Sequence, residues 1–270
     1  MPPVLTLQSI KKTFNAGTVN EKQVFSGLSL HLQAGDFVTV IGSNGAGKST
    51  LFNLIAGSFL PDEGTVILDG ENMTWVQEHK RSRKIGRLFQ DPLLGTAPHM
   101  TIEENLALAY LRTAKAGTGF SRLSRQTRMV LRQRLADLGL GLEDRMKNPV
   151  GLLSGGQRQA LTLLMATLVP PKLLLLDEHT ASLDPATAEK VLELTKNIIR
   201  EHSITCMMIT HSIQSALDLG NRTIMMNAGD IVLDLDAATR SAMTVPDLLT
   251  AFKEKVAGDG LTNDRMLLAD

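Results

Sequence analysis

The sequence predicts an α/β protein, in which a helical segment is inserted into a mainly parallel sheet. Three observations support this class. Strand patterns and helix patterns alternate after residue 170, and such alternation gives parallel pairing through right-handed crossovers. Between residues 91 and 169 the pattern is mostly helical. A glycine-rich turn at residues 42–50 stands between a strand pattern and a helix pattern.

The N-terminal part is rich in strand patterns. Short apolar or alternating runs bounded by Gly, Asp and Pro predict strands, and these runs occupy residues 5–10, 29–34, 37–42 and 65–70. A helix is predicted at residues 51–57, directly after the glycine-rich turn. In the middle segment, apolar residues spaced by three and four predict helices, at residues 102–114 and 125–140, with a surface loop between them at 116–122.

The C-terminal part returns to alternating strands and helices. Strands are predicted at residues 172–177 and 204–210 and within 222–235, and helices at 187–202, 212–220 and 246–255. Cys206 is the single cysteine and lies in an apolar strand pattern, so we predict a small core residue. We predict core positions also for four methionines in strand patterns, namely Met207, Met208, Met225 and Met226.

Composition argues against several classes of function. Lys plus Arg and Asp plus Glu number 28 each among 270 residues, so no net charge attracts nucleic acid or an anionic membrane. A single cysteine excludes an internal disulfide. No leader pattern is visible, and no apolar run reaches the about 18 residues needed to cross a bilayer. We therefore expect a chain that works in water or at the surface of another molecule, without a nucleic-acid partner.

The most specific motif is GSNGAGKST at residues 42–50, which matches the phosphate-loop pattern G-x-x-x-x-G-K-[ST]. Glycines let the backbone wrap around phosphate oxygens, while amide hydrogens and the helix N-terminus attract negative charge. We expect Lys48 to reach the β- and γ-phosphates and Ser49 to bind Mg²⁺; the alternative is a plain glycine-rich turn. The nucleotide-binding residues predicted here are Gly42, Ser43, Asn44, Gly45, Ala46, Gly47, Lys48, Ser49 and Thr50.

Two adjacent carboxylates, Asp177 and Glu178, follow four leucines. Alone they fit an acid–base pair, a metal site or the polar end of a buried strand. Beside a phosphate loop, a buried parallel strand would deliver Asp177 to the same edge of the sheet, where it holds Mg²⁺ directly or through water. Glu178 is then the candidate for orienting and activating the attacking water.

A third motif, LSGGQ, begins at Leu153 and precedes an apolar helix pattern. Ser154 is a good helix N-cap, and Gly155 and Gly156 leave backbone amides uncovered. This helix start is therefore a second candidate anion site.

The motifs GSNGAGKST, LSGGQ, LLLLDE with SLDP, and ITHS, in this order, resemble the nucleotide-binding subunit of ATP-binding cassette (ABC) transporters. The resemblance implies a P-loop NTPase (RecA-like) core with an N-terminal antiparallel β subdomain and an inserted α-helical subdomain. It implies a single ATPase domain at 1–270, with its core at 1–90 and 170–240, a helical signature subdomain at 91–169 and a short helical tail at 241–270.

The resemblance assigns roles to further residues. Phe14 would stack on adenine, Gln90 would contact the metal and relay to the membrane partner, and His211 would touch the γ-phosphate. Other interpretations are a core phenylalanine, a surface glutamine and a structural histidine. The catalytic residues implied are Glu178, His211, Gln90 and Lys48, and the metal ligands are Ser49, Gln90 and Asp177.

The resemblance also implies a head-to-tail dimer of two copies of the chain with two ATP molecules at the interface. Asp184 would link the two sites; otherwise it is a helix N-cap before Pro185. The signature residues Ser154, Gly155, Gly156 and Gln157 would close over the γ-phosphate bound by the other copy.

One residue departs from the family pattern, because most members carry proline where this chain has His179. A functional role would make it a second proton acceptor or a metal ligand. We favour a loop residue tolerated beside Glu178, because His211 already matches the family's histidine and one neighbouring histidine cannot complete a zinc site.

The implied function is Mg²⁺-dependent ATP hydrolysis that powers separate integral-membrane permease subunits, at the cytoplasmic face of the cell membrane. Motion would pass to the permease through residues 90–105. The closer likeness is to bacterial importers that use a substrate-binding protein, with an amino-acid-like substrate. Alternatives are the ATPase subunit of an exporter, or a soluble ABC ATPase of translation or DNA repair.

Overall fold

The computed structural model describes residues 2–113 and 124–257. The predicted loop at 116–122 and the end of the predicted tail at 258–270 lie outside the described residues. The chain divides into two compact units, one formed by Met1–Arg81 with Thr205–Asp270 and the other by Ser82–Ile204. The subdomain boundaries that the resemblance implies stay a prediction. No helix in the described ranges is long and apolar enough to span a lipid bilayer.

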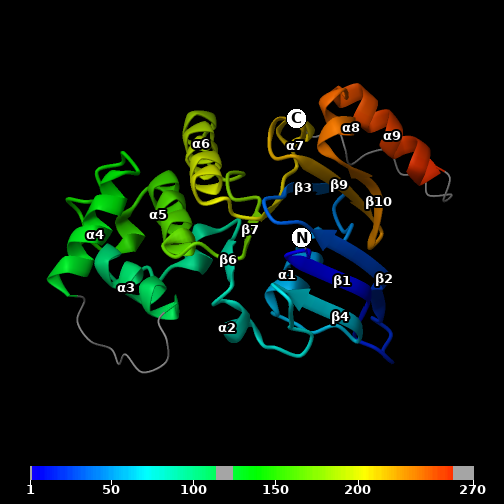
Figure 1. The fold of residues 1–270 in the computed structure, drawn as a ribbon, viewed down its shortest axis with the longest axis horizontal. Coiled ribbons are helices and arrows are strands. Elements are labelled where there is room, and N and C mark those ends of the chain that lie inside the picture. Colours follow the sequence, from blue (N-terminus) through cyan, green and yellow to red (C-terminus); the bar gives the residue numbers. More distant parts are fainter. Residues whose placement is uncertain (1, 114–123, 258–270) are drawn as a thin grey trace. The chain divides into compact units, whose positions relative to one another are not determined.

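The first unit contains an antiparallel sheet built from the N-terminal part of the chain (Figure 1). On its longest strand, Leu28, Leu30 and Leu32 are buried whereas Ser29 and His31 are exposed. This period of two buries one face of the sheet, and the sheet confirms the predicted antiparallel β subdomain. Its strands lie in the order β2 (Lys22–Leu32), β1 (Leu5–Phe14), β4 (Glu63–Leu68) and β5 (Glu71–Asn72).

Parallel strands of the same unit surround β3 (Phe37–Gly42), which is buried along most of its length. β3 pairs in parallel with β8 (Cys206–Ile209) and with β9 (Arg222–Asn227). β9 pairs antiparallel with β10 (Asp230–Leu235) through a tight hairpin. Gly229 in this hairpin has a φ of 90°, and a Cβ there would lie 1.7 Å from the carbonyl oxygen of Val24, so glycine is required. The predicted core positions of the cysteine and the four methionines are confirmed, because all five side chains are buried.

Helices of the first unit pack beside these strands. The predicted helices at 51–57, 212–220 and 246–255 correspond to α1, α7 and α9. A buried apolar cluster joins α7 and α9 to β3, β9 and β10; its members are Ile41, Ala216, Met225, Leu235, Leu248 and Phe252. The helices are α1 (Lys48–Ala56), α2 (Glu78–Arg81), α7 (Ile213–Asp218), α8 (Ala237–Ser241) and α9 (Val245–Ala257).

Arg81 fixes the C-terminal end of α1. Its side chain is fully buried, and its guanidinium donates to the backbone oxygens of Leu54 and Ile55 at 2.8 Å each and of Met73 at 2.6 Å. Burial lowers the pKa of Arg81 to about 10. A cation at a helix C-terminus complements the helix dipole, so α1 is anchored at the end opposite the glycine-rich turn.

The second unit combines a pair of parallel strands with most of the larger helices. β6 (Ile85–Leu88) lies parallel to β7 (Leu173–Asp177), and Leu88 is opposite Leu176. The sequence did not predict β6, because the run is short and carries a charged residue. The remaining elements are η1 (Pro92–Gly95), α3 (Ile102–Thr113), α4 (Arg125–Ala136), η2 (Val150–Leu152), α5 (Gly155–Thr167) and α6 (Pro185–His202).

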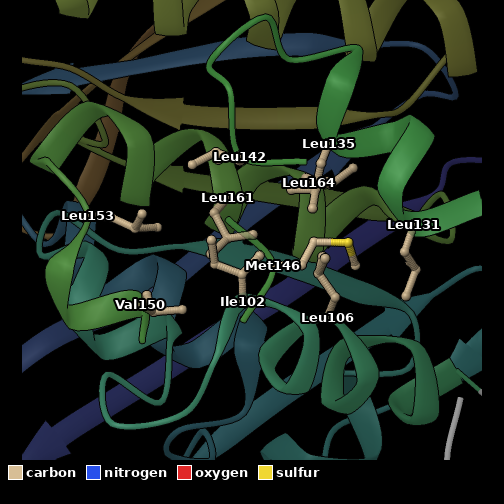
Figure 2. Close-up of a cluster of buried hydrophobic side chains, with 10 residues drawn as sticks. All are labelled: Ile102, Leu106, Leu131, Leu135, Leu142, Met146, Val150, Leu153, Leu161 and Leu164. Carbon is tan, nitrogen blue, oxygen red and sulfur yellow. The ribbon is translucent and has the colours of Figure 1, made fainter. Parts of the chain in front are cut away.

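Three of these helices share one apolar core, shown in Figure 2. α3, α4 and α5 point leucine and isoleucine side chains toward one another, and the segment between α4 and α5 adds Met146 and Val150. Burial of this cluster holds the start of α5 in place, because Leu153 immediately precedes that helix. The full cluster is Ile102, Leu106, Leu131, Leu135, Leu142, Met146, Val150, Leu153, Leu161 and Leu164.

Candidate functional site

In the first unit, the glycine-rich turn has the build of a phosphate loop. Gly42, Gly45 and Gly47 have φ angles of 151°, 81° and 99°, which few other residues adopt. A Cβ at Gly42 would also lie 2.2 Å from the carbonyl oxygen of Met226 on β9. The turn therefore needs glycine for its backbone course and for its close contact with the neighbouring strand.

Helix α1 begins directly after this turn without a side-chain cap. Its N-cap residue is Gly47, which makes no side-chain cap hydrogen bond. The Lys48 ammonium donates back over the turn to the carbonyl oxygens of Gly42 at 2.6 Å and Ser43 at 3.0 Å. Lys48 is only 6% exposed. A buried positive charge thus lies beside a helix N-terminus, an arrangement that attracts phosphate.

His211 lies at the same sheet edge as the phosphate loop. Val40 of β3 is opposite Ile209 of β8, and the Thr210 amide donates to the Val40 carbonyl at 3.2 Å. Gly42 lies two residues after Val40, and His211 lies two residues after Ile209. Because the two strands are parallel, both residues lie at the carboxyl edge of the sheet. His211 is exposed there. Ligands of α/β proteins bind at this edge.

Phe14 ends β1 and is half-buried, not part of the buried core. Its ring packs edge to face with Phe59, with 5.1 Å between ring centroids. The Lys12 ammonium lies 5.5 Å from the centre of the Phe14 ring and 2.7 Å from an oxygen of Asp62. The adenine-stacking role of Phe14 stays a prediction.

In the second unit, β7 ends at Asp177, as predicted. Its carboxylate is 15% exposed and lies 4.0 Å from the guanidinium of Arg87 on the neighbouring strand β6. Arg87 in turn lies 4.5 Å from the centre of the Phe89 ring. Arg87 was not predicted as part of the site, although a charge within the apolar run IGRLF was a signal for it.

Glu178 is held in an unusual backbone conformation. Its φ angle of 45° is in the left-handed region, which a residue with a Cβ adopts at an energetic cost. The Ala181 amide donates to the Glu178 carbonyl at 3.0 Å, so residues 178–181 form a turn. Strained backbone of this kind is common at catalytic sites.

His179 is buried inside this turn, at 2% exposure. Its Nε2 lies 3.3 Å from the Thr195 hydroxyl on α6. Burial lowers the pKa of His179 to about 4, so the imidazole is neutral at physiological pH. The side chain therefore packs between the turn and α6. The sequence predicted a tolerated loop residue at this position but did not predict its burial.

The signature motif begins α5, and Ser154 is its N-cap, as predicted. The Gln157 amide donates to the Ser154 hydroxyl at 3.2 Å, and the Ser154 amide donates to Oε1 of Gln157 at 3.2 Å. This reciprocal capping box satisfies two backbone amides at the helix start. A Cβ at Gly156 would lie 2.1 Å from Cγ2 of Thr187 on α6, so the two helices meet closely at this glycine.

Asp184 is the N-cap of α6. Its carboxylate accepts a hydrogen bond from the Thr187 amide at 3.0 Å, and hydrogen bonds from Thr187 lower the pKa of Asp184. The helix-cap interpretation is therefore confirmed, and the role at a dimer interface stays a prediction. Gln90 is exposed two residues after β6, at the edge where Asp177 ends β7.

The residues of the predicted magnesium site fit this ion by their chemistry. In phosphate sites Mg²⁺ takes one or two carboxylates, a hydroxyl, phosphate oxygens and water. Asp177 and Ser49 supply a carboxylate and a hydroxyl of that kind. No cluster of three or more His, Cys, Asp or Glu side chains able to hold a metal occurs among residues 2–113 and 124–257.

Comparisons of sequence agree with these motifs. A model of the ABC transporter family matches residues 25–181. A tyrosine transport ATP-binding protein of Clostridioides difficile (strain R20291) is 42% identical over 253 residues, which cover 94% of this chain and 100% of that protein. An aliphatic sulfonates import ATP-binding protein of Agrobacterium fabrum is 35% identical, covering 87% and 82%. A methionine import ATP-binding protein of Streptococcus agalactiae is 30% identical, covering 90% and 68%.

Comparisons of structure agree with the fold. A dimeric ATP-binding cassette in a post-hydrolysis state, bound to ADP and phosphate, is similar with a TM-score of 0.74 at 27% identity, covering 86% of this chain and 98% of that one. A component of a transporter complex from Clostridium perfringens has the same TM-score at 21% identity, covering 96% and 98%. The predicted P-loop NTPase fold is thus confirmed.

Proposed function

Because the chain belongs to the ABC transporter family and carries its ATP-hydrolysing cassette, we propose that it is the ATPase subunit of a bacterial importer. The observation that carries this proposal is the build of the phosphate loop. Lys48 is buried at the start of α1, and the N-cap of that helix is Gly47, which has no side chain to cover the helix start. Such a site attracts the β- and γ-phosphates of ATP.

Mg²⁺ is the cofactor in this proposal, held by Ser49 and Asp177 with Gln90 as a further oxygen ligand. When bound, it neutralises charge that develops on the phosphates. The buried Lys48 ammonium supplies positive charge to the same phosphates. Gln90 is exposed beside the end of β6, which supports contact with both metal and membrane partner.

Glu178 is the proposed general base. It orients the attacking water and accepts its proton as the water oxygen bonds to the γ-phosphorus and the bond from that phosphorus to the β–γ bridging oxygen breaks, which gives ADP and phosphate. His211, at the carboxyl edge of β8, donates a hydrogen bond to the γ-phosphate. Positioning and electrostatic stabilisation supply most of the rate enhancement in phosphoryl transfer.

Two copies of the chain form the proposed head-to-tail dimer. The start of α5, from Ser154 to Gln157, covers the γ-phosphate bound by the other copy, and Asp184 links the two sites. Phe14 stacks on adenine. ATP favours the closed dimer and its hydrolysis reopens it, so each cycle produces a motion.

Separate permease subunits receive this motion at the cytoplasmic face of the membrane. Leu93 and Leu94, three and four residues after Gln90, are 39% and 69% exposed and are suited to an apolar contact. The relatives named for tyrosine transport and methionine import support an amino-acid-like substrate. A substrate-binding protein is the further partner in this proposal.

The decisive experiment replaces Glu178 with glutamine. Glu178→Gln should keep ATP binding and slow hydrolysis by about 10²- to 10⁴-fold, because the amide cannot accept the proton. Turnover is measured as phosphate release, and dimer formation by light scattering with ATP present. Glu189→Gln, an exposed glutamate on α6, is the matched control and should keep normal turnover. Normal turnover in Glu178→Gln would refute the assignment.

A further inference from the structure

His179 is the buried polar residue of the site that the proposed mechanism does not use. It lies in the turn between β7 and α6, immediately after the proposed base, and is 2% exposed. Burying a polar side chain costs free energy unless it finds a hydrogen-bond partner. The partner of His179 is Thr195, sixteen residues farther along the chain.

The direction of this hydrogen bond follows from its neighbour. The Thr195 hydroxyl donates its single hydrogen to the Val191 carbonyl at 2.7 Å, because a carbonyl can only accept. Toward His179, 3.3 Å away, the hydroxyl oxygen can therefore only accept. Nε2 of His179 must carry the hydrogen and donate it. The imidazole is thus held in one tautomer and one orientation.

The bond acts on the backbone of Glu178. Glu178 has a φ of 45°, and such a conformation persists only where surrounding contacts hold it. The turn hydrogen bond from Ala181 fixes one side of the turn. The His179 side chain restrains the turn in a second way, because its hydrogen bond connects the residue after Glu178 to α6.

The same helix carries Asp184 at its start. Asp184 is the exposed N-cap of α6, and Thr195 lies farther along the helix in a buried stripe with Val191 and Ile199. A displacement of α6 would move Thr195, and the hydrogen bond to His179 would pass this movement to the residue next to Glu178.

We propose that His179 is a positioning residue, which holds Glu178 in its left-handed backbone conformation through the hydrogen bond to Thr195 and so couples the attacking-water site to helix α6. The proposal rests on the proposed function, in which Glu178 is the base. It assigns a role to His179, which the sequence predicted as a loop residue tolerated beside Glu178.

The test removes the acceptor without changing the shape of the side chain. Thr195→Val in the full-length chain should lower kcat for ATP hydrolysis by about 3- to 10-fold, the value of one hydrogen bond, and leave the ATP KM unchanged. Thr195→Ser keeps the hydroxyl and should restore kcat. His179→Gln offers an amide hydrogen near the position of Nε2 and should retain more activity than His179→Leu.

Thr167→Val is the matched control. Thr167 is a buried threonine on α5 whose hydroxyl also donates to the carbonyl four residues before it, that of Leu163 at 2.7 Å. It has the same type of bond without a histidine, so its loss should lower the melting temperature and leave kcat unchanged. If Thr195→Val behaves in the same way, His179 is only structural and the proposal is wrong.

A measurement on the unaltered chain tests the required hydrogen bond even if Thr195→Val fails to fold. Nitrogen-15 chemical shifts of labelled histidine should show His179 protonated at Nε2. Protonation at Nδ1 alone would overturn the proposal. Failure of the proposed function is distinguishable, because it would appear as normal turnover in Glu178→Gln, whatever the His179 variants do.

Discussion

Helices α1 and α5 both begin at glycine-rich turns, but their first turns are built in opposite ways. A helix start has four backbone amides without helical partners. At α1 the N-cap is Gly47, which offers no side chain, and Lys48 adds a buried positive charge. At α5 the N-cap Ser154 and Gln157 satisfy each other's backbone amides.

Of the two helix starts, α5 has a side-chain N-cap from its own chain and α1 does not. α1 has a glycine N-cap and a buried cation in its first turn, whereas α5 is capped by a side chain and packs its second glycine tightly against α6. We therefore expect ATP binding at the phosphate loop to depend on the charge of Lys48. The stability of the signature turn should depend on the close fit between α5 and α6. Three substitutions test this comparison.

Removing the charge at α1 should have the largest effect. Lys48→Ala should weaken ATP binding about 100-fold or more, because charge-assisted hydrogen bonds to phosphate are lost. Titration calorimetry measures the affinity. Lys196→Ala, an exposed lysine on α6, should bind ATP normally. An unchanged affinity in Lys48→Ala would contradict the phosphate-loop assignment.

Adding bulk at α5 should have the next largest effect. Gly156→Ala places a Cβ 2.1 Å from Cγ2 of Thr187, and such overpacking costs about 1 to 3 kcal/mol in the free energy of unfolding. Urea unfolding measures this loss. Thr187→Ser removes the clashing methyl group and should restore much of the stability in the double variant. Gly155→Ala, whose nearest contact is 3.2 Å, should cost less.

Removing the cap of α5 should have the smallest effect on stability. Ser154→Ala should cost about 1 kcal/mol, since the Gln157 amide loses its acceptor. The control is Ser124→Ala, which removes the equivalent N-cap of α4. Both variants should lose similar stability, but only Ser154→Ala should lower turnover. Equal turnover in the two variants would argue against a role for Ser154 at the γ-phosphate.

Local patterns predicted most of the elements and the starts of α3 and α4, whereas the helix predicted at 125–140 ends already at Ala136. Ser154 could be predicted as an N-cap because capping depends on residues three positions apart. β6 could not, because its four residues carry Arg87, whose partner Asp177 is distant in sequence. The burial of His179 also depends on a distant residue, Thr195. The signal for Thr195 was a polar residue on the apolar stripe of α6, between Val191 and Ile199.

The environment of Cys206 makes the chain well suited to site-specific labelling. This thiol is the single cysteine, it is fully buried in β8, and burial raises its pKa. A protonated, inaccessible thiol reacts slowly with maleimides. Leu152→Cys, at a position that is 68% exposed beside the signature turn, would then be the one thiol that reacts readily. Fluorescence transfer between two labelled copies could follow their association with the native cysteine left in place.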